Sequence, residues 1–470
     1  MKNLLAKLMI LFCAINSNLN AQIYFNNLYP YHSQVANASS VIELDTGGYL
    51  FKGCPSGTYP SLVILRINSN GDTLFTKEYV KPSYSFSLGT SNSIIHTYDN
   101  EYVFSGSILN PTNNRDALLV KLTENGDTLW TKTFGGANFD NANTVCQTPD
   151  SGFVLMGVTQ SFSNGPASDF YLVKTDKNGN FQWQHAYGTT AAEDCVSGQI
   201  TLDGGFIMTG HRSNQFYIVK TDNAGNMQWQ QTYAGTSGAC FIKQLTDSSY
   251  ILTGAKVVTG FAGEAYMIKI NKPGGIIWQN HYGSASVNDW FYTEPIVLSD
   301  GSIVVGGQQM QGGIGLGMLV KTDSFGNQQW LRTYFSNTSY TNYVYDVKHT
   351  LDNGFVLSGY VTNPWLVKVD SNGCEYAGCN VGIEELGVDG GEIEIYPNPA
   401  TNEFTLTTKN QQLKTIHIYN VLGEEVLKLE RIATSEKAID ISSWKAGVYF
   451  VEVETEKGLV RKKVIKSTMY

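Results

Sequence analysis

Short runs of β-forming residues, separated by turn residues, recur along most of the chain. A representative stretch has its apolar and aromatic runs at Thr144–Gln147, Phe153–Thr159, Phe170–Thr175 and Phe181–Tyr187. The sequences Asp-Ser-Gly and Asn-Gly-Asn separate two pairs of these runs, and they are typical of hairpin turns that need a positive φ. This stretch therefore predicts four antiparallel strands.

The same pattern is repeated seven times. Each copy contains Asp-x-Gly-aromatic-apolar-apolar-x-Gly, followed by apolar-apolar-Lys-x-Asp-x-x-Gly-x-x-x-Trp, with small departures. The glycine of the second motif recurs about every fifty residues, at Gly71, Gly126, Gly179, Gly225, Gly274, Gly326 and Gly373. Repeated units of four strands are typical of β-propeller blades, so the sequence predicts an all-β, seven-bladed β-propeller. A stacked solenoid is the alternative.

The two ends of the repeat region favour a closed ring. The seventh unit stops after its third strand, Trp365–Val369, and no Trp-containing strand follows. The segment Ile23–Tyr29 aligns with the fourth strand Phe181–Tyr187 and places Phe25 where Trp183 stands. An N-terminal strand in the last blade would pair two open sheet edges. We therefore predict that residues 22–380 form the propeller and that the N-terminal strand closes the last blade.

The composition changes after the repeats. Charged residues make up about 13% of residues 22–380 and about 27% of residues 393–470, with a Gly- and Glu-containing linker at 381–392 between them. Such a step marks a domain boundary. Alternating apolar runs in the last segment predict a small antiparallel β-sandwich of the immunoglobulin-like kind.

This last segment resembles the type A C-terminal sorting domains of the type IX secretion system. The resemblance rests on Ile395-Tyr396-Pro397-Asn398-Pro399-Ala400, Ile416 to Gly423, Ala446-Gly447-Val448-Tyr449 and Lys463-Val464-Ile465-Lys466. It assigns the sorting motif to Pro397, Asn398, Pro399, Gly423, Gly447, Lys463 and Lys466. It implies that the type IX machinery carries the protein to the outer-membrane surface or the medium. More weakly, the repeats resemble delta-60 and quinoprotein-like repeats, which implies fold kinship but no quinone chemistry.

The N-terminus, the charge and the cysteines agree with export. Residues 1–21 have the basic start, short apolar centre and small final residue of a signal peptide, and no later stretch could span a bilayer. The formal charge of −9 argues against nucleic-acid binding. In an oxidising compartment Cys374 and Cys379 could form a local disulfide, and we expect the other mature cysteines to pack as small buried side chains. No metal or cofactor motif is evident.

Residues that occur in every copy are expected to build the blades. We interpret Trp130, Trp183, Trp229, Trp278 and Trp330 as packing between blades. A basic residue recurs at Arg66, Lys121, Lys174, Lys220, Lys269, Lys321 and Lys368, and we expect it to pair with a repeat carboxylate rather than hold a cofactor. Asp176–Asn180 resembles half a calcium loop, but a hairpin turn is the preferred interpretation.

Residues that precede or break the pattern are the candidates for binding. Asp140, Asp194 and Asp289 enter innermost strands, and Trp290 has no counterpart in the other copies. Such acids and an aromatic ring at one mouth of the channel could hold a cation or stack on a sugar ring; capping of strand starts is the alternative. The sequence favours a non-catalytic binding or adhesion module with a glycan or protein ligand. A surface hydrolase of polysaccharide or peptide is the second hypothesis.

Overall fold

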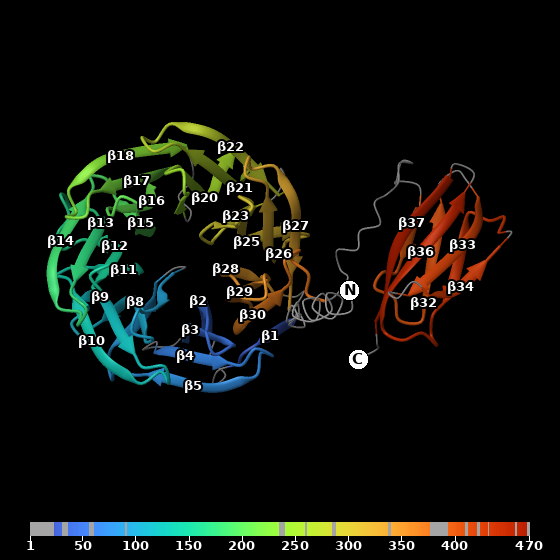
Figure 1. Cartoon of the computed structure of the whole chain (residues 1–470), viewed down its shortest axis with the longest axis horizontal. Coiled ribbons are helices and arrows are strands. Elements are labelled where there is room, and N and C mark those ends of the chain that lie inside the picture. Colours follow the sequence, from blue (N-terminus) through green and yellow to red (C-terminus); the bar gives the residue numbers. More distant parts are fainter. Residues whose placement is uncertain are drawn as a thin grey trace, which may run out of the picture. The chain divides into compact units, whose positions relative to one another are not determined.

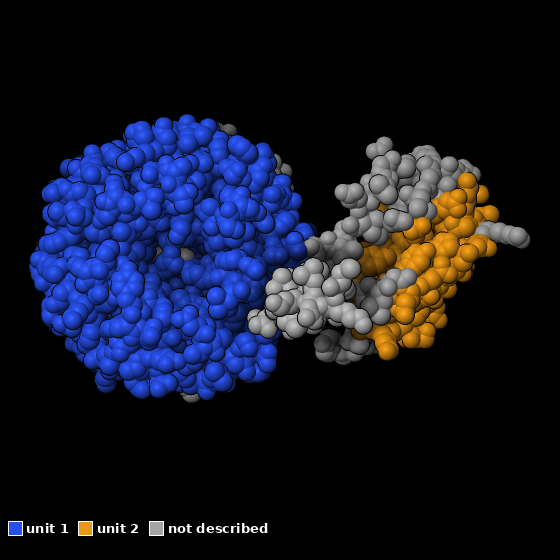
Figure 2. All heavy atoms as spheres, in the orientation of Figure 1, with its two compact units in different colours: residues 1–375 blue, residues 376–470 orange. Residues whose placement is uncertain are grey.

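The computed structural model describes residues 23–30, 36–55, 61–89, 92–234, 240–258, 261–283, 288–336, 340–376, 393–408, 412–420, 424–430, 432–455 and 458–467. The predicted signal peptide, the predicted linker, Cys379 and Gly423 lie outside these residues. The chain divides into two compact units, residues 1–375 and 376–470 (Figure 2).

The first unit is a β-propeller, and its described strands form seven antiparallel sheets around a ring (Figure 1). Sheet 1 contains β2 (Ala36–Glu43), β3 (Tyr49–Pro55), β4 (Leu62–Ile67) and β5 (Thr73–Tyr79). Sheet 2 contains β6 (Ser85–Leu88), β7 (Ile94–His96), β8 (Tyr102–Leu109), β9 (Arg115–Leu122) and β10 (Thr128–Phe134). Sheet 3 contains β11 (Asp140–Gln147), β12 (Phe153–Thr159), β13 (Asp169–Thr175) and β14 (Phe181–Tyr187). The prediction of an all-β fold is confirmed.

The remaining sheets follow in chain order. Sheet 4 contains β15 (Glu193–Ile200), β16 (Phe206–Arg212), β17 (Gln215–Thr221) and β18 (Met227–Ala234). Sheet 5 contains β19 (Phe241–Gln244), β20 (Tyr250–Val258), β21 (Phe261–Ile270) and β22 (Ile276–Tyr282). Sheet 6 contains β23 (Asp289–Phe291), β24 (Ile296–Val297), β25 (Ile303–Gln311), β26 (Ile314–Thr322) and β27 (Gln328–Tyr334). Sheet 7 contains β28 (Tyr343–His349), β29 (Phe355–Tyr360), β30 (Pro364–Val369) and β1 (Phe25–Leu28).

The N-terminal strand β1 supplies the fourth strand of sheet 7. It pairs antiparallel with β30, with Phe25 opposite Lys368. Asn26 accepts a hydrogen bond from the indole of the buried Trp365 at 2.6 Å and donates to the Phe335 carbonyl at 3.1 Å. The first and last parts of the repeat region are thus joined by backbone pairing and by side-chain hydrogen bonds.

A repeated contact links each sheet to the next. A tyrosine hydroxyl at the end of an outer strand donates to the carbonyl of a glycine in the following sheet. The pairs are Tyr29–Gly71, Tyr79–Gly126, Tyr187–Gly225, Tyr233–Gly274, Tyr282–Gly326 and Tyr334–Gly373. These glycines have positive φ, and a Cβ at Gly225 or Gly326 would lie 2.4 or 2.8 Å from an aromatic ring of the preceding sheet, which is a clash. The repeated glycine therefore serves both the hairpin turn and the packing between sheets.

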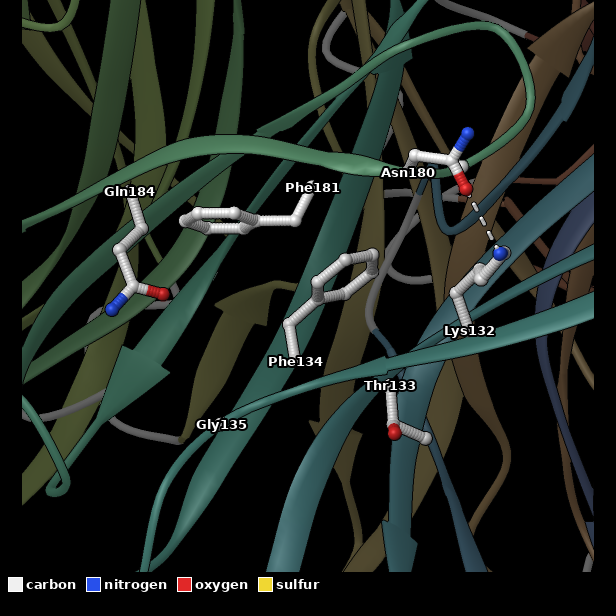
Figure 3. A pocket seen from close by; sticks show the side chains of 8 residues that line it. Lys132, Thr133, Phe134, Gly135, Asn180, Phe181 and Gln184 are labelled. Carbon is white, nitrogen blue, oxygen red and sulfur yellow. Dashed lines mark hydrogen bonds between the residues drawn. The ribbon is translucent and has the colours of Figure 1, made fainter.

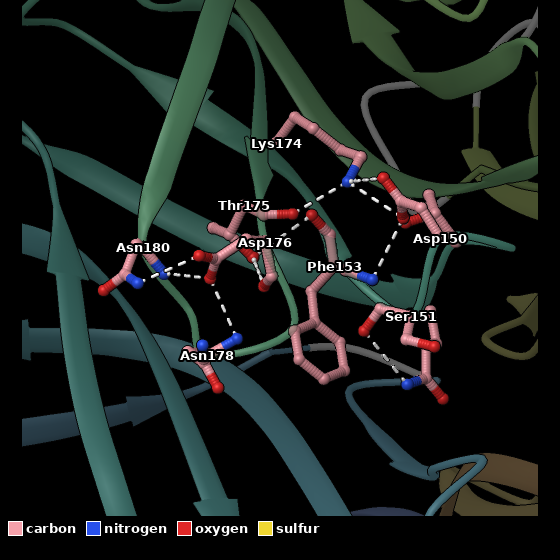
Figure 4. Close-up of polar contacts among 11 residues, drawn as sticks. Asp150, Ser151, Phe153, Lys174, Thr175, Asp176, Asn178 and Asn180 are labelled. Atoms are coloured by element: carbon pink, nitrogen blue, oxygen red, sulfur yellow. Dashed lines mark hydrogen bonds and ion pairs between the residues drawn. The ribbon is translucent and has the colours of Figure 1, made fainter.

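The repeated Trp and Lys residues also serve the fold. Trp130 of sheet 2 packs edge-on against Phe153 of sheet 3, with ring centroids 6.0 Å apart, so packing between sheets is confirmed there. Lys174 pairs with Asp150 at 2.9 Å and donates to the Thr175 carbonyl (Figure 4). The equivalent pairs are Lys121–Asp99, Lys220–Asp203, Lys269–Asp247 and Lys368–Asp352. Burial alone would raise the pKa of Asp150, but hydrogen bonds from Thr148 and Lys174 lower it to about 2.

The Asp176–Asn180 segment is a hairpin turn. One Asp176 carboxylate oxygen accepts the backbone N–H groups of Asn178 and Asn180, each at 2.8 Å (Figure 4). The other oxygen accepts the Asn180 side-chain amide at 2.9 Å. The carboxylate is used to hold the turn, as the preferred interpretation of this motif predicts.

A lysine that the repeat does not require is buried between sheets 1 and 2. Lys52 is 0% exposed and donates to the carbonyls of Ser105 at 2.6 Å and Ser93 at 3.3 Å. Burial lowers the pKa of Lys52 from 10.5 to about 7. Above pH 7 Lys52 is neutral in the native state but still protonated in the unfolded state. The free energy of unfolding should therefore increase with pH until the pH reaches 10.5, the pKa of Lys52 in the unfolded chain.

We expect this effect in a comparison of the wild type with Lys52→Met. Between about pH 7 and pH 9 the Tm of the wild type should rise relative to that of the variant, because only the wild type releases the proton on folding. Thermal melts at several pH values measure this difference. A constant or falling difference would mean that Lys52 keeps an ordinary pKa in the folded protein.

The second unit is a small antiparallel β-sandwich. One sheet contains β31 (Ile393–Tyr396), β32 (Glu403–Thr408) and β35 (Glu436–Asp440). The other contains β34 (Glu425–Leu429), β33 (Leu413–Asn420), β36 (Gly447–Thr455) and β37 (Gly458–Lys466). Their inward-facing residues, among them Phe404, Ile416 and Val451, form a core of their own. This unit therefore buries its apolar residues independently of the propeller.

Candidate functional site

Two of the predicted acidic residues hold the starts of inner strands. Asp140 is fully buried and accepts the hydroxyls of Thr159 at 2.5 Å and Ser161 at 2.6 Å, and the N–H of Gly136 at 2.8 Å. Asp289 is also fully buried and accepts the N–H of Met310 at 3.0 Å. These contacts favour the capping alternative for both residues.

In sheet 4 the equivalent position is Glu193, not Asp194. Glu193 pairs with Arg212, two residues after the repeat glycine Gly210, just as Asp140 pairs with Thr159 after Gly157. Glu193 is fully buried and accepts the Thr189 hydroxyl at 2.7 Å. Because neighbouring residues of a strand face opposite sides, the one-residue shift turns the Asp194 side chain away from the equivalent direction.

Asp194 lies partly exposed beside a histidine. Its carboxylate is 3.2 Å from His211 Nε2 and accepts the Ser168 hydroxyl at 3.2 Å. The hydrogen bond from His211 is the main reason that the pKa of Asp194 lies below its ordinary value. Asp140, Asp194 and Asp289 thus stand on three different sheets, each with partners close by in its own region of the ring.

Trp290 belongs to a group of aromatic side chains on sheets 6 and 7. Its ring stacks with Tyr292, with centroids 6.2 Å apart, and Tyr292 lies 6.2 Å from Tyr343 and 6.0 Å from Tyr345. Tyr343 in turn stacks on Tyr345 at 5.5 Å and on Tyr360 at 6.4 Å. All five side chains are neither fully buried nor fully exposed. We call Trp290, Tyr292, Tyr343, Tyr345 and Tyr360 the aromatic wall.

The aromatic wall is close to the centre of the ring. Four of its residues lie on or directly after β23 and β28, which are innermost strands in Figure 1. Figure 2 shows that the propeller is hollowed at its centre. Burial raises the pKa of Tyr292 to about 12, so its hydroxyl stays protonated at neutral pH. Flat, partly exposed rings of this kind can pack against apolar faces of a ligand.

A buried network of polar side chains crosses the centre of the ring. Glu294 of sheet 6 accepts the Ser197 hydroxyl of sheet 4 at 2.8 Å and the side-chain amide of Asn92 from sheet 2. Lys348 of sheet 7 donates to the Asn92 side chain at 2.5 Å and pairs with Asp346 at 2.8 Å. Sheets 2, 4 and 6 are not neighbours in the ring, so these bonds must cross the channel. We call Asn92, Ser197, Glu294, Asp346 and Lys348 the channel network.

The charges of the channel network are held in a desolvated setting. Glu294 is 6% exposed, and burial raises its pKa, while Lys243 and Lys348 act in the opposite direction. Asp346 is fully buried and accepts the Ser40 hydroxyl at 3.0 Å and the Val41 N–H at 3.1 Å. Hydrogen bonds between side chains thus cross the channel at this level. In sheet 6, Trp290 and Tyr292 of the aromatic wall precede Glu294 of the channel network. In sheet 7, Tyr343 and Tyr345 of the wall precede Asp346 and Lys348 of the network. The wall and the network therefore occupy successive levels along the channel.

The channel network was missed from the sequence. Its members are far apart in the chain, since Asn92 and Lys348 are separated by 256 residues. One signal was available: the inner strands of sheets 2 and 6 are each split, into β6 and β7 and into β23 and β24. Asn92 and Glu294 lie at these interruptions, where the repeat pattern is lost.

The sorting-motif residues that the structure describes are used inside the second unit. Asn398 accepts the Ile465 N–H at 2.9 Å and donates to the Lys463 carbonyl at 2.8 Å, so it joins the Pro397–Pro399 turn to β37. Lys466 is 9% exposed and donates to the Thr401 carbonyl. Gly447 begins β36 opposite Lys466. These residues brace one edge of the sandwich.

Cys374 is fully buried and disulfide-bonded. Its predicted partner, Cys379, lies outside the described residues. Cys54, Cys146, Cys195 and Cys240 are free thiols, and burial raises the pKa of the Cys54 thiol to about 11. The described residues contain no helix that is long and apolar enough to cross a membrane.

Comparison with known families identifies the C-terminal unit. Residues 394–467 match the secretion system C-terminal sorting domain, which confirms the predicted type IX sorting domain. This domain indicates export to the extracellular side or the outer-membrane surface. A curated endo-acting ulvan lyase from Formosa agariphila is 31% identical over 78 residues, which are 16% of this chain and 15% of the lyase. The chain therefore matches only a small part of that relative.

Solved structures resemble the propeller at very low sequence identity. A catalytically inactive virginiamycin B lyase from Staphylococcus aureus, solved with quinupristin, is 10% identical with a TM-score of 0.48, over 74% of this chain and 99% of the lyase. YCF48 bound to a peptide has 10% identity and a TM-score of 0.44, over 75% of this chain and 98% of that one. A protein of unknown function from Dyadobacter fermentans has 11% identity and a TM-score of 0.42, over 73% and 97%.

Proposed function

We propose that the propeller is a non-catalytic binding module that works outside the cell and takes a carbohydrate ligand on the aromatic wall. The observation that carries this proposal is the wall itself, because five aromatic side chains adjoin one another on two neighbouring sheets. The C–H faces of sugar rings pack on such flat aromatic surfaces, and the tyrosine hydroxyls can bond with sugar hydroxyls.

The channel network supports a binding site with a floor. Glu294 is held by Ser197 and Asn92, and Lys348 joins Asn92 to Asp346, so the network spans the channel next to the wall. A ligand would therefore enter from the mouth on the side of the wall and rest above a rigid polar surface. Sites of this kind are concave, largely pre-formed and lined by aromatic rings with a few polar groups.

We expect the exported chain to bind glycans and Trp290→Ala to weaken that binding by about 2- to 13-fold, since one aromatic contact is worth roughly 0.5–1.5 kcal/mol. A glycan array with residues 22–470 identifies the ligand, and calorimetric titration of the best glycan compares the variant with the wild type. Trp278→Phe is the matched control, because Trp278 occupies a repeat position on the outer strand β22. Binding that Trp290→Ala leaves unchanged would contradict the proposal.

A surface hydrolase remains the second candidate, and one observation favours it. Burial raises the pKa of Glu294 and the negative charge of Asp346 acts in the same direction, and a glycoside hydrolase needs a carboxyl group with a raised pKa as its general acid. The ulvan lyase similarity also concerns a protein named for a polysaccharide substrate, although it covers little of the chain. Turnover of a polysaccharide by the wild type, lost in Glu294→Gln with its fold intact, would establish this alternative in place of a binding module.

A further inference from the structure

One junction of the ring lacks the repeated tyrosine bond. In the other six sheets a tyrosine at or next to the end of the outer strand donates its hydroxyl to the glycine carbonyl of the next sheet. Sheet 2 ends in Phe134, four residues after Trp130, at the same repeat position. A phenylalanine has no hydroxyl, so among the described residues no tyrosine reaches the carbonyl of Gly179 in sheet 3.

A cavity opens at this junction. It has a volume of about 440 Å³ and is bounded by Phe134 from β10 and by Gly179 and Phe181 from the turn and start of β14 (Figure 3). Phe181 is 55% exposed, whereas Phe134 is only 7% exposed (Figure 3). The cavity therefore combines one exposed aromatic ring with a glycine whose repeat equivalents use their carbonyl as an acceptor.

The polar groups of the cavity favour an acid. Lys132 donates to the side-chain oxygen of Asn180 at 3.1 Å and keeps its other ammonium protons for further bonds (Figure 3). Gln184 accepts the Tyr171 hydroxyl at 2.6 Å through its carbonyl oxygen, which leaves its amide group as a donor. The described lining residues include no aspartate or glutamate, and the nearby carboxylates of Asp116 and Asp140 lie behind Gly135.

We propose that this rim cleft, between β10 and β14, binds an acidic sugar, a uronate unit of a polysaccharide. Its hydroxyl takes the place of the absent tyrosine hydroxyl as the donor to the Gly179 carbonyl. Its carboxylate pairs with Lys132, and one face of its ring packs on Phe181. A uronate carries these three features on one rigid ring, whereas a neutral sugar lacks the charge that Lys132 matches.

The rim cleft is separate from the aromatic wall. Its residues belong to sheets 2 and 3 at the outer strands, whereas the wall belongs to the inner strands of sheet 6 and to sheet 7. The proposal therefore stands whether or not the wall binds a ligand. Variants at the two places separate the two ideas, because Trp290→Ala should leave uronate binding at the cleft unchanged.

The test uses oligomers of galacturonate, glucuronate and mannuronate as probes, with neutral oligomers of galactose for comparison. We expect the full exported chain to bind at least one uronate oligomer and the neutral oligomer at least about tenfold more weakly. Phe134→Tyr restores the missing hydroxyl and should reduce uronate binding at least tenfold while the Tm stays equal or rises. Lys132→Gln should also reduce binding and remove its dependence on salt.

Tyr282→Phe is the matched control for Phe134→Tyr. This variant removes a tyrosine hydroxyl at the equivalent position, at the junction of sheets 5 and 6, where Phe134→Tyr adds one at the junction of sheets 2 and 3. It should therefore lower the Tm and leave uronate binding unchanged. Three results would overturn the proposal: no binding to any of the three uronate oligomers, binding that Phe134→Tyr leaves intact, or a preference for a Glu- and Tyr-containing peptide over every uronate.

Discussion

Removal of residues 23–29 should lower the stability of the propeller by at least about 6 kcal/mol, since Phe25 and Tyr29 are each buried and aromatic truncations in a core cost roughly 3–5 kcal/mol. The deletion also removes the bond from Trp365 to Asn26 and the bond from the Tyr29 hydroxyl to the Gly71 carbonyl. It exposes the edge of β30. Chemical denaturation of the chain with and without these residues measures the loss.

A peptide of residues 23–30 provides the control for this deletion. Added in trans, it should bind the open edge of β30 and restore part of the lost Tm, because backbone pairing does not require a covalent link. Asn26→Ala in the intact chain should have a smaller effect, of about 1–3 kcal/mol, through the unsatisfied Trp365 indole. An unchanged melt after the deletion would show that β1 does not hold the ring closed.

The second large effect is expected at the channel network. Lys348→Met should destabilise the propeller by about 3–5 kcal/mol, because it leaves the fully buried carboxylate of Asp346 without its cation. It also removes one of the two side chains that hold Asn92. Urea denaturation, with the free energies extrapolated to zero denaturant, provides the comparison.

A double variant separates the lost ion pair from a general disturbance of the channel. Asp346→Asn combined with Lys348→Met removes both charges, so it should recover part of the stability that Lys348→Met alone loses. A double variant that is less stable than the sum of its parts would mean that the pair is not the stabilising feature.

The repeat made much of the fold predictable. Every sheet uses the same hairpins, so a glycine such as Gly179 and a pair such as Lys174–Asp150 could be assigned once and transferred around the ring. The pairing of β1 with β30 followed from an unfilled strand position in the seventh unit. Local sequence patterns are informative where the same local geometry recurs.

The candidate site was much less predictable, and the reasons are physical. The sequence predicts Asp194 at the start of the inner strand of sheet 4, but the structure places Glu193 at the equivalent position. An error of one residue at a strand start assigns the side chain to the wrong face of the sheet. Glu294 and Asn92 meet only because the ring brings sheets 2 and 6 to a common centre. Trp290 is predicted from the sequence because it breaks the pattern, but three of the four tyrosines of the aromatic wall come from the neighbouring sheet 7.

The central claim is that repeated residues build this ring and pattern-breaking residues bind. Paired measurement of Tm and glycan affinity on Trp290→Ala and Tyr282→Phe tests it most directly. We expect Trp290→Ala to lose affinity with little change in Tm, and Tyr282→Phe to lose Tm with little change in affinity. The reverse assignment, or equal loss of both properties in both variants, would contradict the claim.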